Sequence, residues 1–70
     1  MDKMTTADFR RLAQECEDRL DFEGAAAYWR LALSRYPEGG GELAAKDRDN
    51  IRRRWADCLY FAEVFQWINS

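Results

Sequence analysis

The chain has no histidine, a single proline and only two cysteines in 70 residues. Histidine is the side chain used most often in general acid–base catalysis, and it is a common zinc ligand. The two cysteines, Cys16 and Cys58, are far apart and form no Cys-x-x-Cys pair. No phosphate-binding or dinucleotide-binding glycine motif is present. We therefore expect no catalytic residue, no metal ion and no cofactor.

A signal peptide and a long apolar run are also missing from the sequence. The first residues are polar, and no segment has the length of a membrane span. We expect a cytoplasmic protein that does not use a membrane. Because disulfides are rare in the cytosol, Cys16 and Cys58 are predicted to be reduced and buried, with a Cys16–Cys58 disulfide as the alternative.

The overall composition is that of a folded chain of small size. Hydrophobic residues make up 47% and charged residues 34%, with a net charge of −2. The absence of a basic surplus argues against a general nucleic-acid-coating protein. A single domain of this length, residues 1–70, buries little apolar surface, so self-association is a common support for its stability.

Helix signals dominate, and no segment has the two-residue period of a strand. Thr5 and Asp8 resemble a capping box before a helix over about 6–20, and Asp21 can cap a second helix over about 22–36. The short turn between them predicts an antiparallel hairpin. The Pro/Gly-rich residues 37–41 form a loop, and a long helix follows over about 42–67. The expected fold class is all-α, a hairpin plus one long C-terminal helix.

Apolar residues repeat at spacings of three and four in each predicted helix, as on one helix face. In the first helix they are Phe9, Leu12, Ala13, Cys16 and Leu20. In the second they are Phe22, Ala25, Ala26, Trp29, Leu33 and Tyr36. In the third they are Ile51, Trp55, Cys58, Ala62 and Phe65, a seam expected to close the core. Gly24 lies early in the second helix, where it indicates either a close contact or a neutral surface position.

The last helix is apolar nearly all round over residues 59–68, where only Glu63 and Gln66 are polar. Two preceding helices cannot cover every side of it. We interpret its side chains outside the seam as a dimer or partner interface, because exposed aromatic patches are typical of such sites. These residues are Tyr60, Phe61, Val64, Trp67 and Ile68. The alternative is that the segment wraps into the hairpin groove and leaves a few aromatics exposed.

The segment 46–54 is rich in cations: Lys46, Arg48, Arg52, Arg53 and Arg54. The favoured interpretation is a solvated face with an Asp49–Arg53 pair. The alternative is a strip that binds an acidic partner or nucleic-acid phosphates. An acidic group could complement this strip within one chain or across a dimer: Glu15, Glu17, Asp18, Asp21 and Glu23.

Several residues resemble known helical families. Ala13, Ala25, Trp29, Ala32 and Pro37 fall at positions used by a tetratricopeptide repeat, and a hairpin with a charged third helix also resembles the MIT domain. A closer resemblance, over about residues 9–60, is to the PerC and ANR class of small bacterial and phage-borne transcriptional regulators. The residues that match that class are Ala13, Glu17, Phe22, Ala25, Ala26, Trp29, Arg53, Arg54 and Cys58. The triple-glycine loop and the aromatic tail depart from its pattern.

This resemblance implies a non-enzymatic regulator that binds a protein partner, a transcription factor or another host protein, often as an oligomer. For this chain we expect a homodimer in which the C-terminal aromatics make the dimer or bind the target. An inhibitory role as an anti-activator is the expectation for a phage-borne member. Two alternatives stay open from the residues themselves. One is a DNA-binding regulator that uses the cations of segment 46–54. The other is an adaptor that accepts a peptide helix in a hairpin groove.

Overall fold

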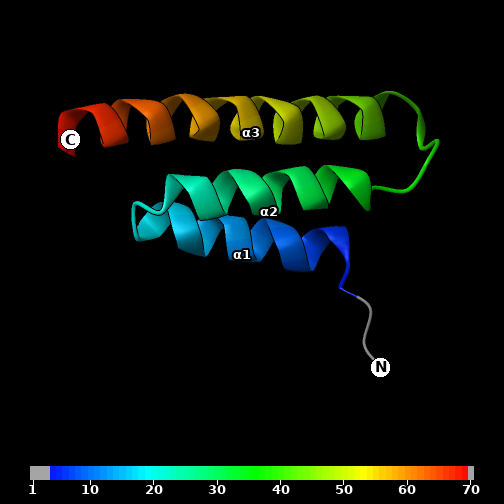
Figure 1. Ribbon diagram of the computed structural model, residues 1–70. Helices are drawn as coiled ribbons and strands as arrows, with labels where there is room; N and C mark the ends of the chain where they lie inside the picture. Colours follow the sequence, from blue (N-terminus) through cyan, green and yellow to red (C-terminus); the bar gives the residue numbers. More distant parts are fainter. Residues whose placement is uncertain (1–3, 70) are drawn as a thin grey trace.

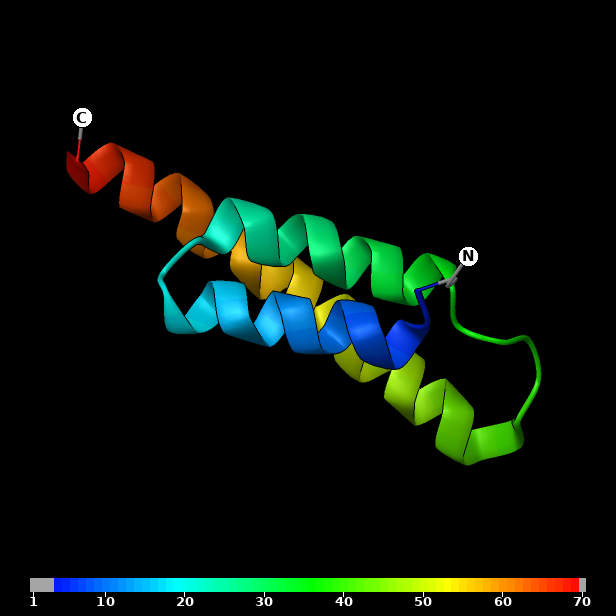
Figure 2. The ribbon, with the colours of Figure 1, turned by 90° about the horizontal axis from the view of Figure 1, so that it is seen from below.

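The computed structural model describes residues 4–69 and contains three helices and no strand within that range. The helices are α1 (Thr6–Asp18), α2 (Phe22–Ser34) and α3 (Gly41–Asn69). Figures 1 and 2 show α1 and α2 as an antiparallel hairpin, with α3 lying across one face of it. The predicted all-α class and the hairpin followed by one long helix are confirmed.

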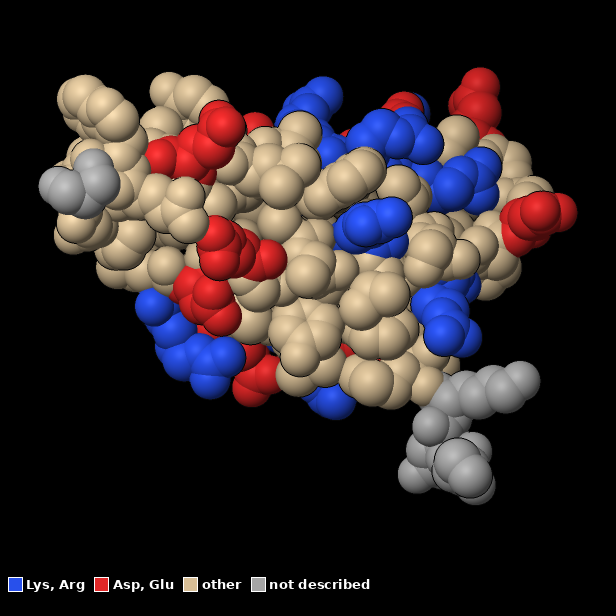
Figure 3. Space-filling model, in the orientation of Figure 1, with Lys and Arg blue, Asp and Glu red and all other residues tan. Residues whose placement is uncertain are grey.

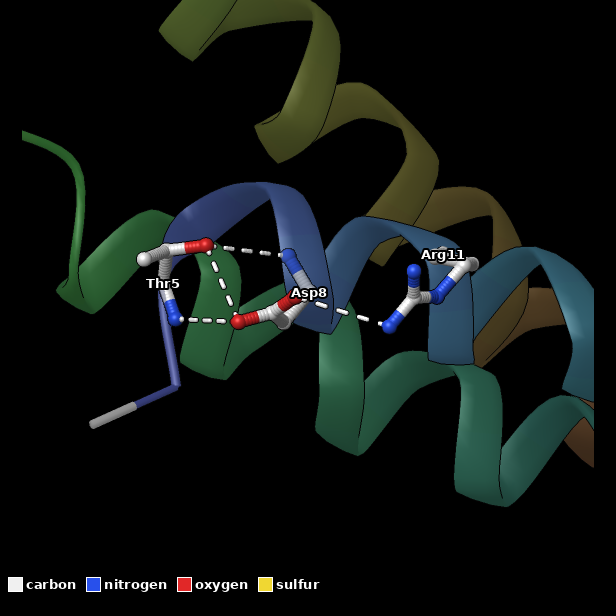
Figure 4. A network of polar contacts seen from close by, with 3 residues as sticks. All are labelled: Thr5, Asp8 and Arg11. Atoms are coloured by element: carbon white, nitrogen blue, oxygen red, sulfur yellow. Dashed lines mark hydrogen bonds and ion pairs between the residues drawn. The ribbon is translucent and has the colours of Figure 1, made fainter. Parts of the chain in front are cut away.

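The capping box predicted at the start of α1 is present. The Thr5 hydroxyl accepts a hydrogen bond from the Asp8 backbone N–H (3.3 Å), and the Asp8 carboxylate accepts one from the Thr5 backbone N–H (2.9 Å). Figure 4 shows this exchange, with Arg11 one turn later 3.5 Å from the same carboxylate. The Thr5 hydrogen bonds, aided by the charge of Arg11, lower the pKa of Asp8.

The first helix ends two residues earlier than predicted, and the reason lies in Leu20. Its backbone has φ 62°, a left-handed conformation that ends the helix, and its side chain is 57% exposed. Backbone hydrogen bonds from Leu20 to Glu17 (2.9 Å) and from Asp21 to Cys16 (2.8 Å) complete a Schellman motif. The placement of Leu20 on the apolar face of the first helix is therefore wrong.

The second helix begins as predicted at an Asp21 cap, whose carboxylate accepts from the Gly24 N–H at 3.1 Å. A Cβ at position 24 would collide with that carboxylate. The close contact predicted at Gly24 is therefore with its own cap. The helix ends at Ser34, before the predicted position 36, because Pro37 disfavours a helical backbone at the residue before it.

The core lies along α2, which packs against both α1 and α3 (Figures 1 and 2). Three alanines of α2, Ala25, Ala26 and Ala32, are buried, so the neighbouring helices can come close to it. The other buried residues are Phe9, Ala13, Cys16, Trp29, Ile51 and Cys58. Both cysteines are free and buried, as predicted.

The third helix is much longer than the two that it covers. Its 29 residues span roughly 43 Å, whereas the 13 residues of α1 or α2 span roughly 20 Å. Its C-terminal end therefore extends past the α1–α2 turn, as Figure 2 shows. The predicted seam is buried at Ile51 and Cys58, but Phe65, which meets only the start of α2, is 44% exposed. The prediction that Phe65 closes the core is wrong for this reason.

Candidate partner-binding surface at the C-terminal end of α3

Glu17 connects all three helices on one edge of the molecule. Its carboxylate accepts a hydrogen bond from the Trp29 indole N–H at 2.6 Å and lies 3.3 Å from the Arg54 guanidinium. The Cys58 thiol donates to the same carboxylate at 3.6 Å. Arg54 also lies over the Trp29 ring, 5.3 Å from its centroid. One acidic residue of the predicted complementary group thus binds the basic segment within a single chain.

A second polar cluster surrounds Asp47 at the other end of the bundle. Its carboxylate accepts from the Tyr36 hydroxyl at 2.7 Å and from Arg10 at 3.0 Å. The hydrogen bond from Tyr36, helped by that from Arg10, lowers the pKa of Asp47. The same hydrogen bond raises the pKa of Tyr36, because the phenol must keep its proton to donate. No sequence pattern indicated this cluster, because its members come from α1, from the loop after α2 and from α3.

The basic segment is divided between internal contacts and the surface. Arg48 donates to the carbonyl oxygens of Pro37 (3.3 Å) and Gly39 (3.1 Å) and lies 5.4 Å from the centroid of the Tyr36 ring. Asp49 pairs with Arg52 at 2.9 Å, so the predicted Asp49–Arg53 pair is wrong.

Only Lys46 and Arg53 among the five cations make no hydrogen bond or ion pair within residues 4–69. Arg53 borders a hollow that Arg10 and Gln14 of α1 also line. The five cations of the segment therefore do not present a single common face.

The environment of Cys58 does not resemble that of a reactive thiol. Burial, together with the negative charge of Glu17, raises the pKa of Cys58 to about 11. A nucleophilic cysteine needs a lowered pKa, because the thiolate is the reactive form. Glu17 therefore acts on Cys58 in the direction opposite to activation.

The five predicted interface residues lie on two sides of the overhanging end of α3. Tyr60 (63% exposed) and Trp67 (79% exposed) lie on the side that faces away from α2, with the half-buried Val64 beside them. Phe61 lies toward the α1–α2 turn, with its ring centroid 5.5 Å from that of Phe22, and Ile68 follows two turns later on the same side of α3. The five residues are thus brought to one end of the molecule but not to one face.

The side toward the turn contains a hollow of about 240 Å³ between α3 and the start of α2. The ring centroids of Phe22 and Phe65 are 6.2 Å apart at this hollow. The side-chain amide of Gln66 donates a hydrogen bond to the Glu23 carboxylate at 2.7 Å. The residues that line it are Leu20, Asp21, Phe22, Glu23, Ala62, Phe65 and Gln66. We call this the turn hollow. Sequence reasoning missed it because Leu20, Phe22 and Phe65 all fit the period of a helix core.

Negative charge surrounds this apolar end. Residues 55–69 contain Asp57 and Glu63 and no lysine or arginine. Asp18, Asp21 and Glu23 add three acids at the turn, where Arg19 is the one cation among residues 18–23. Figure 3 shows that the blue side chains of α3 lie away from its C-terminal end. A ligand of this end would therefore be apolar with positive flanks.

Within residues 4–69 no group of histidine, cysteine or acidic side chains is arranged to hold a metal ion. None of the three helices has the length and apolar character needed to cross a membrane. Comparison of the chain with protein-family models, with curated proteins and with solved structures finds no match.

Proposed function

We propose that this protein is a non-enzymatic regulator that binds another protein at the turn hollow. The observation that carries the proposal is the conformation of Leu20. A leucine in the left-handed region costs roughly 1–2 kcal/mol, and glycine is the usual residue at this place in a Schellman motif. Leu20 nevertheless presents a largely exposed side chain at the rim of the hollow. Strain of this kind, kept where it places an apolar side chain in solvent, is typical of binding sites.

The aromatic residues around the hollow support the same interpretation. Phe22 is half-buried, and Phe61 and Phe65 pack against its ring while keeping 47% and 44% of their own surface exposed. Rings held in place by neighbours lose little freedom when a partner covers them, so they are suitable anchors. The partner segment that fits is apolar and flanked by lysine or arginine, which would meet Asp21 and Glu23 at the hollow.

The identity of the partner class comes from the family resemblance. The PerC and ANR class suggests a bacterial transcription factor or another host protein as the target, with inhibition as the proposed effect. The internal contacts of Arg48, Arg52 and Arg54 favour this over duplex DNA as the target, because these side chains would have to leave their present partners to reach phosphates.

The test compares variants of the hollow with a matched control. We expect Leu20→Gly and Phe65→Ser to remove proteins captured by the wild-type chain from a bacterial lysate, with unchanged helical circular dichroism. Leu31→Ser is the control, because Leu31 is an exposed leucine on α2 that does not line the turn hollow. Capture that survives both hollow variants, or that is lost equally with Leu31→Ser, would refute the proposed site.

The charge of the partner is tested with synthetic helical peptides. A peptide with leucine and phenylalanine anchors flanked by lysines should bind and shift the fluorescence of the chain or of a labelled peptide. The same peptide with glutamates in place of the lysines should bind at least about tenfold more weakly, because it would meet an acidic rim. Equal binding of the two peptides would refute the proposed charge preference.

A further inference from the structure

The side of α3 that faces away from α2 carries a second regular pattern. Its exposed residues recur at spacings of three and four, half a turn from the buried Ile51 and Cys58. They are Lys46, Asp49, Arg53, Ala56, Tyr60, Glu63 and Trp67, and we call them the outer face. Figure 1 shows no other part of the described chain on that side of α3. Residues at this spacing lie along one side of the helix, so a second helix could contact them along its length.

The charges of α3 are divided along its length. Residues 41–54 contain five cations and three anions, whereas residues 55–69 contain two anions and no cation. On the outer face, Arg53 lies in the positive half and Glu63 in the negative half. Neither side chain makes a hydrogen bond or ion pair with residues 4–69. An antiparallel second copy of α3 would therefore place a complementary charge opposite both Arg53 and Glu63.

The sizes of the outer-face residues also fit an antiparallel pair of α3 helices. In an antiparallel pair of α3 helices centred at the level of residue 58, Arg53 lies opposite Glu63 of the second copy. The small Ala56 then lies opposite the large Tyr60 of the second copy. Both matches occur twice, because a two-fold axis relates the copies. Residues 47–69 of each copy overlap in this register, a length of roughly 35 Å.

We propose that the second copy of this chain is the occupant of the outer face, and that the protein is an antiparallel homodimer paired through α3 in this register. A parallel pair would place Arg53 against Arg53 and Glu63 against Glu63, which is repulsive. A contact along most of α3 provides a length of surface suited to an interface of about 800 Å² per partner. The dimer leaves the turn hollow uncovered, so this inference goes beyond the proposed function and does not depend on it.

The first measurement is the mass in solution. Sedimentation equilibrium should give twice the chain mass of 8.3 kDa at micromolar concentration. A monomer up to high micromolar concentration would overturn the proposal. Tyr60→Ser should raise the dissociation constant of the dimer by at least about tenfold, because Tyr60 is a central aromatic contact. Its helical circular dichroism should stay that of the wild type, since Tyr60 is largely exposed.

A charge swap tests the register. Arg53→Glu and Glu63→Arg should each weaken the dimer by at least about tenfold, since each places like charges together. The double variant with both changes should return the dissociation constant to within a few-fold of the wild type. Positions 53 and 63 are roughly 15 Å apart along α3, so rescue cannot arise within one chain. Arg30→Glu is the matched control, because Arg30 is an exposed cation on α2.

The dissociation constants of these variants support or overturn the antiparallel register. Weakening by both single changes and rescue by the pair support the antiparallel register. A dimer that both single changes leave intact, or that the double variant fails to restore, overturns it. Loss of the dimer in Arg30→Glu as well would show that the weakening comes from net charge alone, and this result would also overturn the register. Because the variants of the turn hollow leave the outer face unchanged, failure of the dimer and failure of the proposed partner site are distinguishable.

Discussion

The indole N–H of Trp29 donates a 2.6 Å hydrogen bond to the carboxylate of Glu17. Trp29 is the largest buried side chain of α2, and its one polar atom needs an acceptor at the edge of the core. Glu17 supplies that acceptor from α1 and at the same time holds Arg54 of α3. One carboxylate thus links a side chain of α2 and a side chain of α3 to α1.

The first prediction concerns Glu17→Gln. An amide can still accept from Trp29, but it loses the charge that binds Arg54. We expect the free energy of unfolding to fall by about 1–3 kcal/mol, since hydrogen bonds to charged groups are stronger than neutral ones. Urea denaturation measures this value. Glu15→Gln is the control, because Glu15 is exposed, and a loss of equal size in that variant would contradict the prediction.

The second prediction is that Leu20→Gly stabilises the fold while it impairs partner binding. Glycine adopts φ 62° without the steric cost that leucine has there. We expect a gain of roughly 0.5–1 kcal/mol in the free energy of unfolding, less than the full strain because glycine also has more freedom in the unfolded chain. Thermal denaturation shows whether the variant is more or less stable than the wild type. A lower midpoint than that of the wild type would show that Leu20 is not strained.

The third prediction uses the pKa of Cys58, which is raised from an ordinary value of 9.0 to about 11. The folded state therefore keeps the thiol proton at a pH where the unfolded chain releases it. The resulting stabilisation is fully present below pH 9 and is lost as the pH rises toward 11. Under reducing conditions, the stability difference between wild type and Cys58→Ala should shrink over that interval. A difference that stays constant from pH 8 to 11 would contradict it.

The fourth prediction concerns the contribution of the Asp47 carboxylate to stability at acidic pH. Its pKa is lowered in the folded state by hydrogen bonds from Tyr36 and Arg10. The stabilisation is thus present above the pKa of an unfolded aspartate, about 3.9, and is lost as the pH falls through the folded value. At pH 6 the wild type should be more stable than Asp47→Asn, and chemical denaturation should show the two converging as the pH falls below the pKa of an unfolded aspartate. Parallel pH profiles for the two proteins would refute the role of the ionised carboxylate.

The fifth prediction separates a protein target from nucleic acid. If Arg48, Arg52 and Arg54 serve the fold, the chain should not retard duplex DNA in a gel even at low salt, where phosphate contacts are strongest. A histone-like basic protein serves as the positive control. Retardation that weakens steeply with added salt, and that Arg53→Glu reduces, would favour the DNA-binding alternative.

Local sequence was sufficient for the helix boundaries that depend on neighbouring residues. Thr5 with Asp8 and the Asp21 carboxylate were predicted as caps, and both form. The two boundary errors have local causes as well. Leu20 adopts a conformation that is rare for leucine, so the end of α1 could not be read from composition, and Pro37 stops α2 before Tyr36.

The candidate site was harder to predict because it depends on where one helix ends relative to another. Tyr60, Phe61, Trp67 and Ile68 were expected at the surface and are exposed. Phe65 fits the period of the buried seam as well as Ile51 does, yet only Phe22 at the start of α2 packs against its ring, and 44% of its surface stays exposed. Periodicity identifies a face of a helix, but it carries no information on the length of the elements that cover that face.

By itself, the sequence determined the three helices, their order and the residues that form the core along α2, because capping and apolar spacing act within a few residues of the chain. Tertiary structure decided which charges are used internally and which apolar residues stay exposed. Arg54 meets Glu17 and Asp47 meets Arg10 only once the helices pack side by side. The end of α3 is exposed because α3 is longer than the helices of the hairpin. Which residues this leaves uncovered is decided only when the helices pack against one another.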